Sequence, residues 1–308
     1  MKKYIGVEIG GTKLQVFLGD TNMKIIRRSL INVGEIKSAD IIKQKIEQVI
    51  LEFLKTDNIC GIGVGFGGPI DYKTGIIATS HQVKGWSGVN LKKWFEDISG
   101  LPVQVENDAN TAALAEAVLG KGKTYDKVFY VTLGSGVGGG YIINKEIYHG
   151  KTPGEAEIGQ MRYDKTGVTF ESLCSGWAVD KKLREYVSTH PKSQLAKLVG
   201  KNNSGEAKFV VQAIEDGDTG AKAIMEETAN DLAFGLSHVI HLFNPEIIIL
   251  GGGLSLTGEL LRQSVYSNIP KYVMKTFHPI TDVQIAGLGE DVVVIGSLLL
   301  AQKISTKK

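Results

Sequence analysis

The chain has 308 residues, of which 43% are hydrophobic and 22% are charged, the composition of a globular protein with room for two domains. Its 35 basic and 33 acidic side chains leave a formal charge of +2, too small an excess to favour binding to a nucleic-acid backbone. Cys60 and Cys174 fall in no CxxC or Cys/His cluster, so the sequence indicates neither a disulfide framework nor a zinc site, and a reducing cytoplasm fits best.

The amino-terminal sequence MKKYIGVEIGG has a short apolar run that Gly6 and Glu8 interrupt, too short for a signal peptide or a membrane span. We therefore expect neither export nor membrane insertion. The unusual feature of the composition is 38 glycines against 7 prolines, because many of these glycines gather in a few tight clusters.

The first part of the chain predicts a three-strand meander, two helices and two further strands. The expected strands are 4–9, 14–18, 23–28, 59–64 and 103–105, with a turn at 65–69, a hairpin signal at 71–75, and helices at 38–54 and from about 109 to 119. The later part repeats the opening pattern. Its expected strands are 128–133, 140–143, 146–148 and 246–250, with a glycine turn at 134–139, helices at 175–190, 219–243 and 292–301, and an exposed loop at 201–205.

The repeated meander suggests two related halves that face each other across a cleft. No low-complexity linker separates them, so we expect a hinge near 119–127. We assign residues 1–119 to an amino-terminal lobe and 120–291 to a carboxy-terminal lobe. The last helix, about 292–306, is expected to pack back on the first lobe.

Three glycine-rich turns each follow a strand: Gly10-Gly11-Thr12-Lys13, Gly134-Ser135-Gly136 and Gly251-Gly252-Gly253. Glycine lets backbone N–H groups approach phosphate oxygens, and the hydroxyls of Thr12 and Ser135 can add donors. The alternative is that each turn only forms a tight hairpin. None matches the Walker A pattern, and the GxGxxG letters at 134–139 lie between two strands, so a dinucleotide site is weakly indicated.

Asp108 follows a short strand and precedes an alanine-rich helix, which places a carboxylate at the edge of the expected cleft. Phosphoryl transfer to a hydroxyl needs a group that orients the attacking oxygen and takes its proton, and an aspartate can do both. The alternative is structural, because Asn107 or Asp108 could simply be the N-cap of the helix. From position alone both interpretations stay open.

Several segments resemble the ROK family of sugar kinases and related repressors. They are GVEIGGTK at 6–13, ENDANTAALA at 106–115, VTLGSGVGGG at 131–140, GEAEIG at 154–159, NPEIIILGGG at 244–253 and GEDVVVIG at 289–296. The resemblance runs almost from end to end. It implies an α/β chain with a two-lobed, actin-like ATPase (ribonuclease H-like) fold, with ATP between the lobes and a hexose deep in the cleft.

The resemblance also implies roles for individual residues. Asp108 matches the catalytic base, and the matching sugar contacts are Asn107, Gly68, Glu157 and Glu171. The matching nucleotide turns are Gly10 to Lys13, Gly134 to Gly136 and Gly251 to Gly253. Without the family, Glu157 and Glu171 would be ordinary surface acids.

The sequence departs from the family pattern at the sugar pocket. Gln160 stands where the family has a histidine that binds both sugar and zinc, and the cysteine-rich loop is missing between Met161 and Glu171, so we expect no structural zinc. Gln82 stands where the family often has an asparagine, which lengthens a possible sugar ligand by one carbon. Glu8 replaces the commoner aspartate of the first phosphate motif and keeps a carboxylate that can orient water bound to Mg²⁺.

The sequence therefore predicts Mg²⁺-dependent phosphorylation of a hexose hydroxyl by ATP, in a protein whose partner is a small sugar. By its resemblance to the family, the protein is expected to form a homodimer. A sugar-responsive repressor is the rival, although the first strand at about Tyr4 leaves no helix-turn-helix segment ahead of the first phosphate motif. A sugar-binding protein without catalysis is the third interpretation. The sequence does not identify the sugar.

Overall fold

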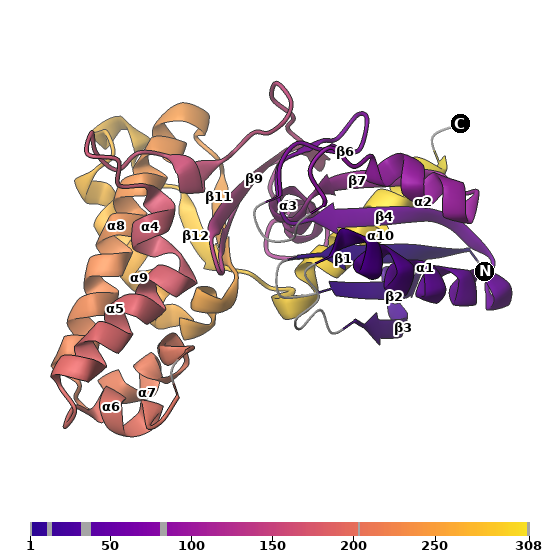
Figure 1. The fold of residues 1–308 in the computed structure, drawn as a ribbon. Coiled ribbons are helices and arrows are strands. Elements are labelled where there is room, and N and C mark those ends of the chain that lie inside the picture. Colours follow the sequence, from indigo (N-terminus) through magenta and orange to yellow (C-terminus); the bar gives the residue numbers. More distant parts are fainter. Residues whose placement is uncertain (1, 11–13, 32–37, 81–84, 203, 307–308) are drawn as a thin grey trace. The chain divides into compact units, whose positions relative to one another are not determined.

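The structure is a computed structural model that describes residues 2–10, 14–31, 38–80, 85–202 and 204–306. The chain forms two compact units. The first contains residues 1–118, 145–155 and 290–308, and the second contains 119–144 and 156–289. Each unit is built on its own sheet with helices packed against it, so the predicted α/β class is confirmed (Figure 1).

The first unit begins with the predicted meander and ends with the last helix of the chain. Its elements are β1 (Lys3–Ile9), β2 (Leu14–Asp20), β3 (Ile25–Leu30), α1 (Ala39–Thr56), β4 (Ile59–Phe66), β5 (Ile70–Asp71), β6 (Ile76–Ile77), α2 (Leu91–Ser99), β7 (Val103–Asn107), α3 (Asp108–Val118), β10 (Glu146–Ile147) and α10 (Val292–Thr306). The sheet order is β3-β2-β1-β4-β7. Strands β1, β4 and β7 run parallel, so their carboxyl ends share one edge.

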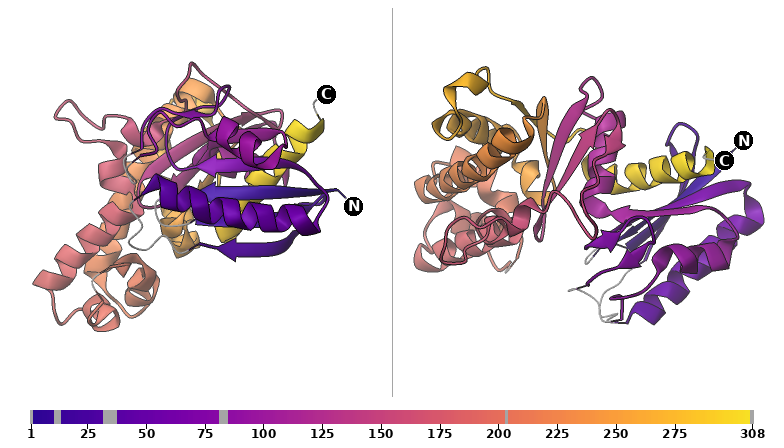
Figure 2. Two further views of the ribbon diagram at one scale, coloured as in Figure 1. Left: turned by 45° about the vertical axis from the view of Figure 1, so that its right-hand side comes forward. Right: turned by 90° about the horizontal axis from the view of Figure 1, so that it is seen from above.

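The two faces of this sheet carry different side chains. Ile5, Val7 and Ile9 of β1 belong to an apolar core that includes Ile46 and Ile50 of α1. The opposite face of β4 carries Gly61, Gly63 and Gly65 in alternation, as the period of a strand requires. A Cβ atom on any of the three would crowd α10, which lies along these strands (Figure 2). The absence of side chains therefore lets the backbone of α10 approach the sheet.

Helix α10 also meets the helix that carries Asp108. A Cβ atom on Gly296 of α10 would overlap the backbone of Thr111 in α3, and Ser297 donates a hydrogen bond of 3.2 Å from its Oγ to the carbonyl oxygen of Val7. The last helix, which the sequence analysis expected to return to the first half, lies in the first unit. Its packing fixes α3 against the sheet.

The second unit repeats the strand order of the first. Its elements are β8 (Lys127–Leu133), β9 (Val137–Ile143), α4 (Phe170–Cys174), α5 (Gly176–Thr189), α6 (Gln194–Val199), α7 (Val210–Glu215), α8 (Thr219–Phe243), β11 (Ile247–Gly251), α9 (Glu259–Asn268) and β12 (Asp282–Ile285). Its strands lie in the order β9-β8-β11-β12, antiparallel and then parallel, like β2-β1-β4-β7. The predicted internal repeat is confirmed as a repeated topology.

Two sequence-based expectations need correction. The glycine turn expected at 134–139 covers only residues 134–136, because β9 already begins at Val137 and Gly138 to Gly140 lie within this strand. The sequence analysis also predicted no helix between residues 190 and 219, where α6 and α7 lie on either side of the expected loop; the described residues of 201–205 are themselves in neither a helix nor a strand, as expected. Among the described residues, no helix has both the length and the apolar character needed to cross a bilayer.

Replacing Gly63 with alanine should destabilise the first unit, because the new methyl group would overlap the carbonyl oxygen of Ser297 in α10. Overpacking of this kind costs about 1–3 kcal/mol. Gly253→Ala is the matched control, since no atom lies within 4 Å of a Cβ there. Denaturant unfolding followed by circular dichroism measures both, and equal stability of the two variants would contradict the close approach of α10.

Candidate active site

Three loops of the first unit meet at the carboxyl edge of the parallel strands. Gly10 follows β1, Gly67 and Gly68 follow β4, and Asp108 follows β7. The N–H of Gly67 donates to the carbonyl of Ile9 at 2.8 Å, and a Cβ on Gly67 would lie 3.4 Å from both the Cα of Gly10 and a carboxylate oxygen of Asp108. Ligands of open α/β sheets bind at such an edge.

The N-cap of α3 is Asn107 rather than Asp108. The Oδ1 atom of Asn107 accepts hydrogen bonds from the N–H groups of Ala109 at 2.8 Å and Asn110 at 3.2 Å, the cap geometry of a helix start. Its amide nitrogen donates to the carbonyl of Gly68 at 3.2 Å. Asn107 thus joins the glycine turn to the helix, and the carboxylate of Asp108 is not needed as the cap.

Asp108 is half-buried in the first turn of α3. One of its carboxylate oxygens accepts from the N–H of Ala109 at 2.9 Å. A carboxylate at a helix N-terminus interacts favourably with the aligned peptide dipoles, so this position suits an acidic side chain.

Glu8 is the buried carboxylate of β1, two residues before Gly10. Its side chain accepts a hydrogen bond of 2.8 Å from the amide of Gln15 on the neighbouring strand β2. This contact holds the Glu8 carboxylate near the start of the first glycine turn. The other predicted residues of this turn, Gly11, Thr12 and Lys13, lie outside the described residues, as does the predicted sugar ligand Gln82.

The second unit carries the other two glycine turns at the carboxyl ends of parallel strands β8 and β11. Gly134 to Gly136 join β8 to β9, and Gly251 to Gly253 lead out of β11. The N–H of Gly176, at the start of α5, donates to the carbonyl of Gly134 at 2.8 Å. The backbone of Gly252 lies so close to that of Leu133 that a side chain would overlap it.

Protein packing explains some of these glycines but not all of them. A Cβ on Gly136 would overlap the Glu171 carboxylate, and Gly252 also has a positive φ of 81°. By contrast, among the described residues a Cβ on Gly253 has no neighbour within 4 Å, and on Gly134 it would meet only the Thr132 hydroxyl at 4.0 Å. Neither of these two has a positive φ. Their bare backbone fits a ligand that approaches closely.

Glu171 braces the glycine turn of its own unit. Its carboxylate accepts a hydrogen bond of 2.9 Å from the N–H of Val137, directly after Gly136. Gln160 is exposed, and Glu157 is exposed as well. The N–H of Phe170 donates to the carbonyl of Met161 at 2.9 Å. Because Met161 follows Gln160 and Phe170 precedes Glu171, this bond brings the backbone at Gln160 close to the backbone at Glu171.

The loop between these two residues is closed by its own hydrogen bonds. The N–H of Tyr163 donates to the carbonyl of Val168 at 2.8 Å, and the phenol of Tyr163 donates to Asp231 of α8 at 3.0 Å. Burial, with this hydrogen bond to the Asp231 carboxylate, raises the pKa of Tyr163 to about 12. The phenol therefore remains a donor at neutral pH and ties the loop to α8.

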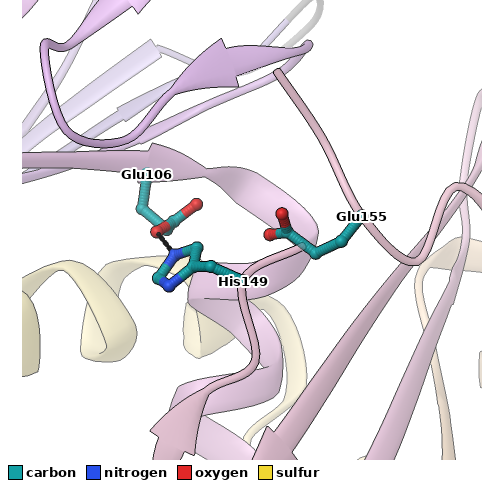
Figure 3. A group of neighbouring side chains, drawn as sticks. All are labelled: Glu106, His149 and Glu155. Atoms are coloured by element: carbon teal, nitrogen blue, oxygen red, sulfur yellow. Dashed lines mark hydrogen bonds and ion pairs between the residues drawn. The ribbon is translucent and has the colours of Figure 1, made fainter. Parts of the chain in front are cut away.

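The sequence analysis missed one polar cluster beside Asp108. It consists of Glu106 at the end of β7 with His149 and Glu155 of the segment 145–155 (Figure 3). Asn110 of α3 donates to Glu106, and all four residues are in the first unit. Glu106 and Asn110 belong to a motif used above, but His149 lies 43 residues beyond Glu106 along the chain. No local pattern could have connected them.

The chain matches the model of the ROK family over residues 4–304. A glucokinase from Thermotoga maritima is 32% identical over 96% of this chain and 96% of the relative. The crystal structure of a ROK family glucokinase from Streptomyces griseus, in complex with glucose and AMPPNP, has a TM-score of 0.85 at 29% identity and covers 98% of this chain and 99% of that one. A ROK family transcriptional regulator has a TM-score of 0.87 at 21% identity, covering 99% of this chain and 78% of that one.

The chain therefore belongs to the ROK family and has its actin-like ATPase fold, as the sequence motifs predicted. The likeness to the regulator shows the shared fold. The glucokinases are related over nearly the full length of both chains.

Asn107→Ala should loosen the start of α3 and the turn at Gly68 together. Loss of an asparagine cap costs about 0.5–2 kcal/mol. Asn90→Ala is the matched control, because Asn90 caps α2 with an equivalent bond of 2.9 Å to the N–H of Lys93. Both variants should lose similar stability, but hydrogen exchange at Ala109 and Asn110 should accelerate only in Asn107→Ala. Unchanged exchange there would refute the assigned cap.

Proposed function

We propose that the chain is an ATP-dependent sugar kinase in which Asp108 is the general base. The observation that carries this proposal is the placement of the Asp108 carboxylate beside the bare turn at Gly67, at the carboxyl edge of the sheet, while Asn107 serves as the helix cap. The near full-length relationship to glucokinases supports the sugar as acceptor, and glucose is the first substrate to test.

In the proposed reaction, Asp108 accepts the proton of a sugar hydroxyl as that oxygen attacks the γ-phosphorus of ATP. The bond from the γ-phosphorus to the bridging oxygen breaks, and the products are a sugar phosphate, ADP and a proton. Positioning and charge stabilisation supply most of the catalysis in such transfers. Asn107 would hold the base and the Gly68 turn in one arrangement, and Gly68 would offer its backbone to the sugar.

The glycine turns of the second unit, Gly134 to Gly136 and Gly251 to Gly253, are proposed to bind the nucleotide together with Gly10 to Lys13. The exposed backbone at Gly134 and Gly253 supports this assignment, because nothing in the described protein occupies the space beside them. Mg²⁺ would neutralise the phosphate charge when bound, and Glu8 would orient its water shell.

The sugar contacts of the second unit are proposed to be Glu157, Gln160 and Glu171. Glu171 has one oxygen engaged by the N–H of Val137, so it would couple the sugar to the nucleotide turn that it braces. Gln82 completes the proposed set. A carboxylate accepts hydrogen bonds from two vicinal hydroxyls, which suits a hexose.

Asp108→Asn should keep sugar and ATP binding but lose turnover, because an amide cannot take the proton. General base catalysis contributes about 10²–10⁴-fold, so kcat should fall by that factor with KM values changed little. Asp97→Asn, an exposed acid paired with Lys93 on α2, is the control and should keep full activity. ADP release over a panel of hexoses measures both. Near-normal kcat in Asp108→Asn would remove Asp108 from this role, and a wild-type protein that binds sugars without releasing ADP would indicate a sensor.

Gly253→Ala and Gly134→Ala should weaken ATP binding without loss of fold. A methyl group in the open space would block one or two hydrogen bonds to phosphate, which corresponds to about a tenfold or larger rise in Kd. Calorimetric titration with a non-hydrolysable ATP analogue measures this, and sugar affinity in the same variants is the internal control. Unchanged nucleotide affinity in both variants would mean that these glycines serve another purpose.

A further inference from the structure

We propose that Glu106, His149 and Glu155 form a binding site for a divalent transition-metal ion such as Zn²⁺, separate from the Asp108 carboxylate. The three side chains point toward one another (Figure 3), and each offers a ligand atom within 4.8 Å of the other two. Tetrahedral Zn²⁺ with bonds of about 2.0–2.2 Å places its ligands about 3.3–3.6 Å apart, so small side-chain movements would close the site.

The charge of the cluster favours a cation. Glu106 is only 2% exposed, and Asn110 donates from a single amide nitrogen to both carboxylates, at 3.1 Å to Glu106 and 2.6 Å to Glu155. Two carboxylates so close together, one buried (Glu106) and one half-buried (Glu155), repel each other. Within the described part of the chain, neither forms an ion pair with a lysine or an arginine. A divalent ion would neutralise both.

Asn110 provides a second, independent indication. Asn110 is only 3% exposed, and its amide nitrogen donates to both carboxylates of the cluster. Among the described residues, its Oδ1 atom has no hydrogen-bond partner. A buried polar atom without a partner calls for a missing water or ion. The two ends of an amide occupy nearly the same space, so rotation by half a turn would direct this oxygen to a metal held by the carboxylates.

The surrounding contacts preorganise the ligands. One oxygen of Glu106 accepts from the N–H of Asn107 at 2.9 Å, which turns the other toward His149 at 2.7 Å. The ring of Tyr72 stacks on His149 with centroids 3.5 Å apart, and the N–H of Gly150 donates to Glu155 at 3.3 Å. Such outer contacts orient metal ligands. One imidazole with oxygen ligands suits Zn²⁺ or Mn²⁺ better than Mg²⁺.

A bound ion would link the segment 145–155 to the junction of β7 and α3, two residues from Asp108. The site would therefore stabilise the junction of β7 and α3 that carries Asp108, whatever reaction the protein catalyses. The proposal does not depend on the proposed function, because binding can be measured without sugar or ATP.

The test is metal binding to the full chain after chelation and dialysis. The wild type should bind about one Co²⁺ or Zn²⁺ per chain, prefer both strongly to Mg²⁺, and gain several degrees in Tm. His149→Gln and Glu155→Gln should lose this binding by tenfold or more. Asp108→Asn and His190→Gln, the latter an exposed histidine of the second unit, should keep it.

X-ray absorption at the zinc edge of the wild type provides a measurement that needs no variant to fold. The expected first shell contains only nitrogen and oxygen, with the multiple-scattering signal of an imidazole. Sulfur in that shell, retention of binding in both His149→Gln and Glu155→Gln, or a wild type that binds no Co²⁺ or Zn²⁺ would each overturn the site.

Discussion

The close approach of α10 to the glycine-bearing face of β4 is the contact on which the first unit depends. Because Gly61, Gly63 and Gly65 present no side chains, the helix lies against the strand backbone, and at Gly296 it also packs against Thr111 of α3. The last residues of the chain therefore determine where Asp108 lies relative to the sheet. This packing is intolerant of added volume, since even one methyl group would overlap the helix backbone. The packing also makes the carboxyl edge of the sheet rigid, so that polar residues there keep fixed positions.

At this edge of the sheet, neighbouring residues have different structural and chemical roles. Asn107 satisfies the first N–H groups of α3 and holds the turn at Gly68, while Asp108, one residue later, keeps its carboxylate at the edge. Glu171 has a comparable position in the second unit, where it fixes Val137 beside the glycine turn. In both units a side chain that the sequence assigned to ligand binding also holds a turn. A substitution at either position would alter stability and binding together, so the two must be measured separately.

The strands and long helices were predictable because their patterns are local. Apolar periodicity located α1 and α8, and the repeated meander anticipated two sheets with the same strand order. The end of the glycine turn at Gly136 was not predictable, because Gly138 and Gly139 look like turn residues until β8 pairs with them. The cluster of Glu106, His149 and Glu155 was not predictable either, since it forms only when the segment 145–155 folds onto β7 and α3. Long-range pairing, rather than propensity, decides both cases.

Glycines in this chain serve two purposes, and the space around each one separates them. At Gly63, Gly136 and Gly252 the protein itself fills the position that a side chain would need, so packing alone accounts for the residue. At Gly134 and Gly253 the neighbouring space is open and φ is ordinary, so neither crowding nor backbone strain accounts for it. A glycine that the fold does not require must be explained by what approaches from outside. The open space at these two glycines supports the proposal that the turns after β8 and β11 bind the nucleotide, and Gly136 is the part of the turn after β8 that packs against Glu171.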